Sequence, residues 1–243
     1  MRLFGLIGNP VTHSQSPDYF HRLWEKEGVT DCRYLLFPME NPEELPGLLR
    51  EYPELQGLNV TSPFKESVLE QADAVDETAA RLRSANVLHI RRGKITAFNT
   101  DHLGFDRLLG KCPHLTETAL ICGSGGAARA VQYSLERHGI RSLMLSRKAA
   151  VGCLIYDRLF PAMLEEYPLI INATPLGMGR LSGECPPIPY EALTTGHTLI
   201  DLIYNPSETL FLKKGKAAGC ACLNGLGMLH AQADEAWKIW KRC

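Results

Sequence analysis

The sequence lacks several features that would point to particular classes of protein. No apolar run approaches the roughly 20 residues that a membrane-spanning helix needs. Charge of one sign is not in excess either, because 26 Lys and Arg stand against 27 Asp and Glu and leave a net charge of -1. A basic surplus that could neutralise nucleic-acid phosphates or dock on an anionic membrane is therefore missing. We expect neither nucleic acid nor a membrane as a partner.

Eight cysteines are present, yet none of them forms a Cys-x-x-Cys pair. Several lie in apolar, strand-like runs, such as the one that ends at Cys122, where a reduced thiol packs as a small hydrophobic group. Neither a disulfide framework nor a metal site is indicated, and no metal is expected. The apolar stretch over Met1–Gly8 is too short for the core of a signal peptide. These observations predict a cytoplasmic protein.

What the sequence does contain is typical of a globular protein. Its 243 residues are 45% hydrophobic and 22% charged, which suits one large domain or two medium ones. Short apolar runs alternate with helix-like segments from end to end, and this alternation predicts an α/β fold with mainly parallel sheets. The expected strands are Leu3–Ile7, Tyr34–Phe37, Leu58–Val60, Ala119–Cys122, Leu143–Ser146, Leu169–Asn172 and Thr198–Leu202. The expected helices are Asp18–Glu27, Glu43–Glu51, Ala127–Arg137, Leu210–Ala218 and Leu229–Lys241.

Two features interrupt this alternation. The strand-like pieces Val87–Ile90 and Lys94–Phe98 flank Arg91-Arg92-Gly93, which predicts a hairpin. Between Asp101 and Thr118 a short helix-like stretch precedes a fresh strand, so this region is the best candidate for a domain boundary. The last helix is amphipathic and must pack on one of the domains.

A glycine-rich turn, Gly123-Ser124-Gly125-Gly126-Ala127, directly follows the strand that ends at Cys122. Glycines at this place allow a tight turn and let backbone N–H groups approach a pyrophosphate at the start of the next helix. Such turns are often merely structural, but the strand before and the helix and second strand after favour a dinucleotide site.

The second strand of that unit ends in Ser146-Arg147-Lys148. NAD-binding folds usually place a carboxylate here to hold the ribose 2′-hydroxyl, and this sequence has none. Two cations and a hydroxyl suit a 2′-phosphate instead, so the pattern favours NADP over NAD. A solvated basic turn is the structural alternative.

The first half contains three segments that resemble helix starts. Ser14 and Ser16 precede Pro17, and their hydroxyls beside free N–H groups suit a small carboxylate, although Ser16 could equally be a plain helix cap. Lys65 follows Ser62-Pro63 in what we expect to be a first helical turn, where a cation opposes the helix dipole and contributes little to stability. Asp101 follows the hairpin and begins another helix, where on its own it could be a plain helix cap. A lysine and an aspartate at such edges could exchange a proton with a hydroxyl as a hydride is transferred at the same carbon.

Taken together, the motifs resemble those of the shikimate dehydrogenases over almost the whole chain. The matching segments share their order along the sequence: Gly8-Asn9-Pro10, His13-Ser14-Gln15-Ser16-Pro17, Gly57–Glu66, Ala85-Asn86-Val87, Asn99-Thr100-Asp101, the glycine-rich turn, Asn172–Met178, Tyr204-Asn205-Pro206 and Asn224–Ala233. Any one of these matches is weak, whereas the ordered set is highly specific.

The resemblance implies the NADP-dependent, reversible reduction of 3-dehydroshikimate to shikimate in aromatic amino-acid biosynthesis. It implies that Lys65 and Asp101 are the catalytic pair. The residues that would hold the substrate are Ser14, Ser16, Thr61, Lys65, Asn86, Asp101, Tyr204 and Gln232. Those that would hold the cofactor are Gly123, Ser124, Gly125, Gly126, Ala127, Ser146, Arg147, Lys148, Leu202, Gly225 and Met228.

The family fold has two α/β domains with a cleft between them. We therefore expect a mainly parallel substrate domain over 1–101, completed by the C-terminal helix over 228–243, and a Rossmann-like NADP domain over 102–227. Three departures from the family pattern stand out. His102 replaces the usual glycine after Asp101. The usual Asn-Arg-Thr after the second cofactor strand reads Ser146-Arg147-Lys148, without the further arginine often found a few residues later. The stretch from Lys148 to Tyr167 is short. We expect that one helix of the cofactor domain is trimmed or lost there.

Two alternatives stay open. A quinate or quinate/shikimate dehydrogenase using NAD would share the fold, but quinate carries an extra hydroxyl at the carboxylate-bearing carbon, and the pair Ser14 and Ser16 favours shikimate. A non-catalytic sensor of the same ligand is disfavoured because Lys65 and Asp101 are both present. The chain is expected to be a monomer or a homodimer.

Overall fold

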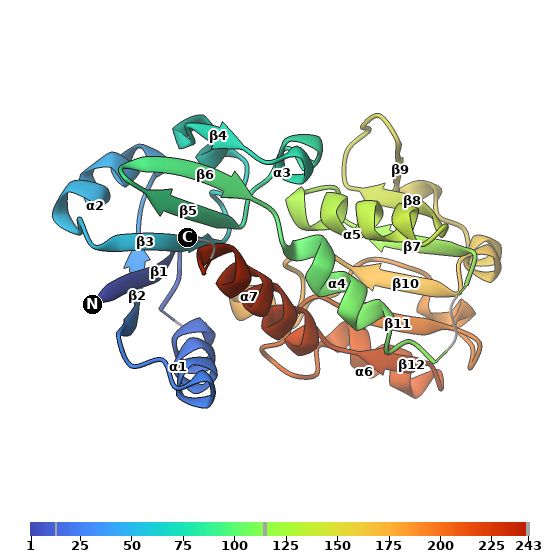
Figure 1. Ribbon diagram of the computed structural model, residues 1–243. Helices are drawn as coiled ribbons and strands as arrows, with labels where there is room; N and C mark the ends of the chain where they lie inside the picture. Colours follow the sequence, from blue (N-terminus) through green and yellow to red (C-terminus); the bar gives the residue numbers. More distant parts are fainter. Residues whose placement is uncertain (13, 114–115, 242–243) are drawn as a thin grey trace. The chain divides into compact units, whose positions relative to one another are not determined.

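The computed structural model describes residues 1–12, 14–113 and 116–241, and these form two compact units (Figure 1). The first unit contains Met1–Thr100 together with the chain from Gln232 onward, and the second contains Asp101–Ala231. The sequence placed the two passages between domains at 101/102 and 227/228. The second boundary therefore lies later in the chain than predicted. It falls within the last helix, α7 (Leu226–Trp240), because Met228 near its start packs in the core of the second unit and its later residues pack in the first. Residues 242 and 243 of the predicted final segment lie outside the described residues.

The first unit is built on a six-stranded sheet with the order β2-β1-β3-β5-β6-β4. Its strands are β1 (Arg2–Gly8), β2 (Cys32–Pro38), β3 (Leu55–Val60), β4 (Ala74–Val75), β5 (Val87–Arg91) and β6 (Lys94–Phe98). The pairs β1/β2, β1/β3 and β4/β6 are parallel, while β5 runs antiparallel to β3 and β6. The predicted hairpin is therefore present, and the sheet is mainly parallel as expected.

The helices of the first unit begin and end where local sequence chemistry favours it. Helix α1 (Ser16–Glu27) has Pro17 in its first turn, where the missing N–H costs nothing, and it ends at Gly28 with a left-handed φ of 69°. Helices α2 (Leu45–Glu51) and α3 (Glu77–Leu82) are short. The sequence did not predict α3 or β4, because each spans too few residues to show a periodic pattern.

Aromatic side chains of α7 fix this helix on the first unit. Trp237 and Trp240 pack with Phe4, Phe20 and Trp24 in one buried cluster, and the ring centroids of Phe4 and Trp240 lie 4.9 Å apart. Trp240 donates from Nε1 to the carbonyl of Leu88 at 2.9 Å. A side chain at Gly57 would lie 2.2 Å from that same nitrogen, so only glycine lets the indole approach the sheet.

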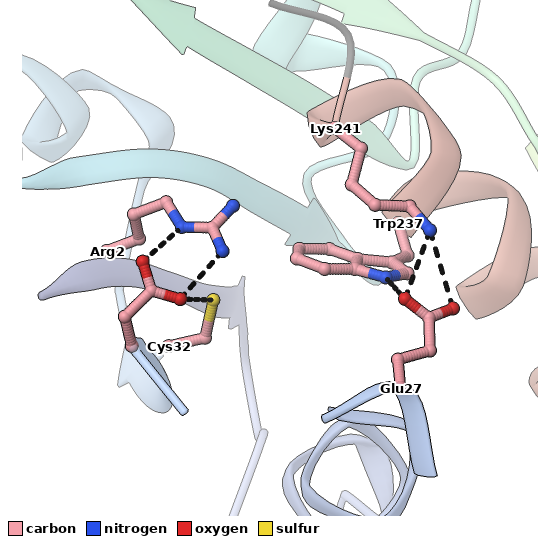
Figure 2. A network of polar contacts seen from close by, with 6 residues as sticks. Arg2, Glu27, Cys32, Trp237 and Lys241 are labelled. Atoms are coloured by element: carbon pink, nitrogen blue, oxygen red, sulfur yellow. Dashed lines mark hydrogen bonds and ion pairs between the residues drawn. The ribbon is translucent and has the colours of Figure 1, made fainter. Parts of the chain in front are cut away.

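A polar network surrounds the other indole (Figure 2). Trp237 donates from Nε1 to Oε2 of Glu27 at 2.8 Å, and Lys241 reaches the same oxygen at 3.1 Å. The guanidinium of Arg2 lies 5.6 Å from the centre of the Trp237 ring and is itself held by Asp31 at 2.8 Å. Charged groups on α1, on β1 and just after α7 therefore lie at the edge of the aromatic cluster.

The second unit has an all-parallel sheet with the order β12-β11-β10-β7-β8-β9. Its elements are α4 (Asp101–Leu109), β7 (Thr118–Cys122), α5 (Gly126–Arg137), β8 (Arg141–Ser146), β9 (Cys153–Ile155), β10 (Leu169–Asn172), β11 (Thr198–Asp201), α6 (Leu210–Ala217), β12 (Ala221–Leu223) and the start of α7. Its strands are apolar and mostly buried, as parallel strands with both faces covered must be. The predicted α/β architecture with two sheets is confirmed.

The segment from Lys148 to Pro168, all of it described, contains β9 and two 3₁₀ helices, η3 (Tyr156–Arg158) and η4 (Pro161–Glu166), and no α-helix. A crossover between parallel strands β8 and β10 usually carries a helix of several turns. The shortened form found here agrees with the trimmed helix that the segment's length predicted. Within the described ranges, the helices are all too short or too polar to cross a bilayer.

Candidate functional site

The predicted substrate residues of the first unit gather at one edge of its sheet. Strand β3 ends at Val60 and is followed by Thr61, while the antiparallel partner β5 begins just after Asn86. The neighbouring strand β6 ends at Phe98 opposite Val87, so Thr100 returns to the same edge. Alternating strand direction thus brings three distant segments together.

Asn86 is the centre of this edge and is only 1% exposed. Its side-chain amide donates to Oε1 of Gln232 at 2.8 Å and to Oγ1 of Thr100 at 3.0 Å. The Asn86 carbonyl oxygen Oδ1 accepts from the backbone N–H of Thr100 at 2.7 Å. Both ends of the amide are therefore oriented by Thr100, which follows β6, and by Gln232 on α7, and the two predicted substrate residues Asn86 and Gln232 are bonded to each other.

The two serines before α1 lie together. Oγ of Ser14 accepts from the backbone N–H of Ser16 at 3.2 Å and donates to the Ser16 hydroxyl at 3.1 Å. The interpretation of Ser16 as helix cap is wrong by a small margin: α1 starts at Ser16, its cap position is Gln15, and Ser14 is the side chain that holds the first turn. Two adjacent hydroxyls at a helix start still suit a carboxylate.

Behind Ser16 stands a buried pair that the sequence analysis did not single out. Tyr34 on β2 donates to Oδ1 of Asn59 at 2.7 Å, and Asn59 donates from Nδ2 to the backbone carbonyl of Asn86 at 3.4 Å. Burial raises the pKa of Tyr34 well above its ordinary value, although a hydrogen bond with Ser16 opposes this shift. These neutral groups connect the serines to Asn86 through β2 and β3.

Lys65 does not lie in a first helical turn. The peptide bond between Ser62 and Pro63 is cis, residues 62–66 form turns, and a 3₁₀ helix begins only at Ser67 (η2, Ser67–Gln71). The expectation of a Ser-Pro-capped α-helix is therefore wrong. The carbonyl of Lys65 accepts from the N–H of Ala85 at 2.7 Å, which anchors the lysine beside the residue that precedes Asn86. Thr61 is tied to the sheet by its own N–H, which donates to Ile7.

The remaining substrate residues of the prediction belong to the second unit. Asp101 is the first residue of α4 and is 4% exposed, and it follows Thr100 directly in the chain. Tyr204 lies in the loop after β11, half-buried. The next residue after Asp101, His102, is buried and packs edge-on against Tyr133 of α5, with ring centroids 5.2 Å apart.

The glycine-rich turn connects β7 to α5 as a dinucleotide loop would. Gly123 has a φ of 114°, and a side chain there would lie 3.1 Å from the carbonyl oxygen of Ala173. Gly125 caps α5, and the position of its missing side chain faces open space. The N–H groups of Gly126 and Ala127 begin the helix, where such groups have no partner within the helix. This geometry fits a pyrophosphate.

A pocket of about 520 Å³ opens beside this loop. It is lined by Ser124, Ser146, Arg147, Lys148, Ala149 and Ala150. The hydroxyl of Ser146 donates to the carbonyl of Lys148 at 2.5 Å, whereas both cationic side chains are exposed. The four predicted polar residues therefore share one hollow, and its donors and charges fit the phosphate of NADP.

The three other predicted cofactor residues lie around the end of β11. A side chain on Gly225 would stand 1.9 Å from the carbonyl oxygen of Leu202, so backbone meets backbone here. Met228 is 8% exposed and packs with Phe105 and Leu108 in the core of the second unit. Leu202 is partly buried against that same cluster.

A buried carboxylate supports this edge of the second sheet and was not identified from the sequence. Asp201 is fully buried and accepts from Asn172 Nδ2 at 3.1 Å, from the N–H of Ile203 at 3.0 Å and from Thr209 Oγ1 at 2.5 Å. Burial raises its pKa, and the three donors partly counteract the shift. Its position at the carboxyl end of a parallel strand is the signal that could have found it.

The sequence is similar to proteins of one known family. Residues 6–88 match the family model described as shikimate dehydrogenase substrate binding domain. The chain is 34% identical over 254 residues to the shikimate dehydrogenase (NADP(+)) of Aquifex aeolicus, covering 100% of this chain and 92% of that protein. It is 38% identical over 259 residues to the Paracoccus denitrificans protein of the same name, covering 98% and 90%.

A solved structure is similar over the same extent. The shikimate 5-dehydrogenase of Thermus thermophilus, crystallised in complex with NADP(H) and shikimate, superposes with a TM-score of 0.88 at 30% identity. The superposition covers 100% of this chain and 94% of that one. Both units of the chain, and not the cofactor-binding fold alone, are therefore shared with these relatives.

Proposed function

Because the chain belongs to the shikimate dehydrogenase family, we propose that it interconverts 3-dehydroshikimate and shikimate with NADP, using Lys65 and Asp101 as an acid–base pair. The observation that carries the substrate half is the edge of the first sheet. There Asn86 bonds to Gln232, and the backbone of Lys65 bonds to Ala85 next to it. Three predicted substrate residues from separate segments thus converge in one unit.

The substrate is a small cyclic acid with several hydroxyls, and the residues offered to it, apart from Lys65 and Asp101, are neutral hydrogen-bonding groups. Ser14 and Ser16 present two hydroxyls 3.1 Å apart at the start of α1, where a carboxylate is favoured. The amides of Asn86 and Gln232 and the hydroxyl of Thr61 suit the ring hydroxyls. Tyr204 completes this predicted set.

Lys65 and Asp101 donate and accept the proton of the reaction. In the direction of reduction the pair donates a proton to the carbonyl oxygen as that oxygen becomes a hydroxyl, and in oxidation it takes the proton back. NADP, when bound, supplies or accepts the hydride. Because a lysine ammonium also stabilises developing negative charge on the oxygen, its contribution is expected mainly in the transition state.

The cofactor is held by the second unit. The N–H groups of the turn from Gly123 to Ala127 bind the pyrophosphate, and Ser124, Ser146, Arg147 and Lys148 surround the 2′-phosphate in the pocket beside it. Leu202, Gly225 and Met228 border the nicotinamide. The open space at Gly125 and the left-handed φ of Gly123 support this assignment.

We further propose that the enzyme works in the cytoplasm on a freely diffusing substrate, as a monomer or homodimer. The seven cysteines within the described residues are all free thiols, which supports a reducing compartment. Burial raises the pKa of Cys122 to about 12, so this thiol stays protonated and serves packing.

The experiment that tests the proposal is the initial rate of oxidation of shikimate and of quinate, each with NADP and with NAD. A rate dominated by shikimate with NADP supports substrate, cofactor and the pocket at Arg147 at once. Faster oxidation of quinate, or a preference for NAD, would overturn the specificity while keeping the acid–base pair. No rate with any of the four pairings would leave a ligand sensor as the better hypothesis.

A further inference from the structure

In the first unit, two separate polar links join helix α1 to the chain from Gln232 onward, which contains most of α7. In the first link, the hydroxyl of Tyr19 donates to Oδ1 of Asp234 at 2.6 Å. In the second, Trp237 and Lys241 both bond to Glu27, as Figure 2 shows. The two links differ in their distance from the predicted substrate residues, and this difference carries the inference.

The Tyr19–Asp234 link lies within one turn of a substrate residue on each helix. Tyr19 follows Ser16 by three residues, which is about 4.5 Å along the axis of α1, and Asp234 follows Gln232 by two, about 3 Å along α7. Glu27 stands about 16 Å along α1 from Ser16. The Tyr19–Asp234 bond therefore connects the two helix segments that carry Ser16 and Gln232. The bonds to Glu27 connect parts of the same helices that are farther from these residues.

The aromatic cluster beneath the helices cannot provide the same precision. Hydrophobic packing of Phe20, Trp24 and Trp237 holds α1 against α7, but it is non-directional and permits small sliding of one helix along another. A hydroxyl-to-carboxylate hydrogen bond is short, strong and directional. At 2.6 Å, the bond between Tyr19 and Asp234 defines the register of the two helices at the level of the site.

We propose that Tyr19 and Asp234 are positioning residues for the substrate: their hydrogen bond sets the spacing between the serine pair at the start of α1 and Gln232 on α7. This inference rests on the proposed function. Through Gln232 the same link also orients Asn86, whose amide donates to Gln232 at 2.8 Å. The serine pair on one side of a small ligand and Gln232 on the other would then be kept at a fixed spacing by the Tyr19–Asp234 hydrogen bond.

The test is steady-state kinetics of Tyr19→Phe with shikimate and NADP. The substitution removes only the hydroxyl and keeps the ring that packs edge-on against Phe20. We expect the KM for shikimate to rise about five- to tenfold, while kcat and the KM for NADP stay within about twofold. Asp234→Ala should reproduce this effect, Asp234→Asn should restore part of it because its amide oxygen still accepts, and Tyr19→Phe/Asp234→Ala should be no worse than either single change.

Glu27→Gln is the matched control because it weakens the distant link between the same two helices. It should lower the midpoint of thermal unfolding and leave the KM for shikimate unchanged. An unchanged KM in Tyr19→Phe, or an equal rise in Glu27→Gln, would overturn the positioning role even if the wild-type enzyme turns over shikimate. Absence of both turnover and shikimate binding in the wild type would instead overturn the proposed function and this inference with it.

Discussion

The two units build their predicted sites from different materials. In the first unit the site consists of side chains, and Asn86, Thr100 and Ser16 are buried, neutral and bonded to one another or to their neighbours. In the second unit it consists of backbone N–H groups, close glycine contacts and the exposed cations Arg147 and Lys148. Both lie where strands end, yet we expect them to respond to substitution in different ways.

The difference follows from the ligands. A small polyhydroxy acid differs from its analogues by single hydroxyls. A buried hydrogen-bonding network discriminates between them, because the wrong analogue leaves a buried donor or acceptor of the protein without a partner. A pyrophosphate is recognised by its negative charge and not by single hydroxyls, so oriented backbone N–H groups suffice to bind it. We therefore expect catalysis and substrate specificity to depend mainly on side chains of the first unit. Cofactor binding should depend on the backbone conformation of the second unit and on its solvent-exposed cations.

The largest effect is expected for Lys65→Ala. The maximal rate of shikimate oxidation should fall about 100- to 10,000-fold, the range for removal of a general acid–base group, whereas the KM for shikimate should change little. Rate constants from full saturation curves would check this. A large rise in KM with an unchanged kcat would make Lys65 a binding residue and weaken the comparison.

Gly225→Ala should produce the next largest effect and tests the backbone character of the second site. The added Cβ would lie 1.9 Å from the carbonyl oxygen and 2.5 Å from the carbonyl carbon of Leu202, so the main chain must move. We expect a loss of about 1–3 kcal/mol in the free energy of unfolding and weaker NADP binding. Calorimetric unfolding and cofactor titration measure both.

Gly183→Ala is the control for that substitution, since no atom lies within 4 Å of the Cβ it would add and its φ is not left-handed. It should leave both the stability and the affinity for NADP near the wild-type values. Equal behaviour of the two alanine variants would show that the contact at Leu202 does not matter.

Arg147→Ala should have a moderate effect that salt can modulate. The KM for NADP should rise about tenfold, corresponding to the loss of one charge-assisted hydrogen bond, and the KM for NAD should stay nearly constant. Because Arg147 is exposed, raising the ionic strength should reduce the difference between wild type and variant. Kinetics at two salt concentrations test both statements, and a parallel rise for NAD would assign the arginine to the fold.

The smallest effect concerns the pH dependence of stability in Glu27→Gln. The hydrogen bond from Trp237, with the contribution of Lys241 and against the opposing effect of burial, lowers the pKa of Glu27 below its ordinary value of 4.5. A lowered pKa stabilises the fold above the ordinary value, and this contribution disappears as the pH falls through the folded-state pKa. The unfolding midpoints of wild type and variant should therefore differ at neutral pH and converge once the pH has fallen below the lowered folded-state pKa of Glu27. A gap that persists in acid would exclude the charge as its cause.

The parts of the molecule that sequence patterns predict are those set by local chemistry. Strand β10 was predicted residue for residue, and the turn at Gly123 was recognised, because apolar runs and glycine positions are encoded locally. The conformation around Lys65 was missed, since Ser-Pro occurs both in helix caps and in turns such as the one with the cis bond before Pro63.

Contacts between distant segments are not encoded in local patterns, and only the family resemblance linked Asn86 with Gln232. Tyr19 and Asp234 are 215 residues apart, and nothing in either local pattern indicates that they meet. The same holds for Tyr34 and Asn59, whose strands come together only through the strand order of the sheet. Pairing partners of buried polar groups depend on topology, which periodicity does not specify.

All three tryptophans of the chain, Trp24, Trp237 and Trp240, lie in the one aromatic cluster of the first unit. Intrinsic tryptophan fluorescence is consequently an optical reporter of that unit alone, with no background from the other. Emission recorded during denaturation follows the loss of the α7 packing, while far-ultraviolet circular dichroism follows both units. The natural placement of its fluorophores thus makes it possible to observe whether the two halves of this enzyme unfold together or in sequence, without attaching any label.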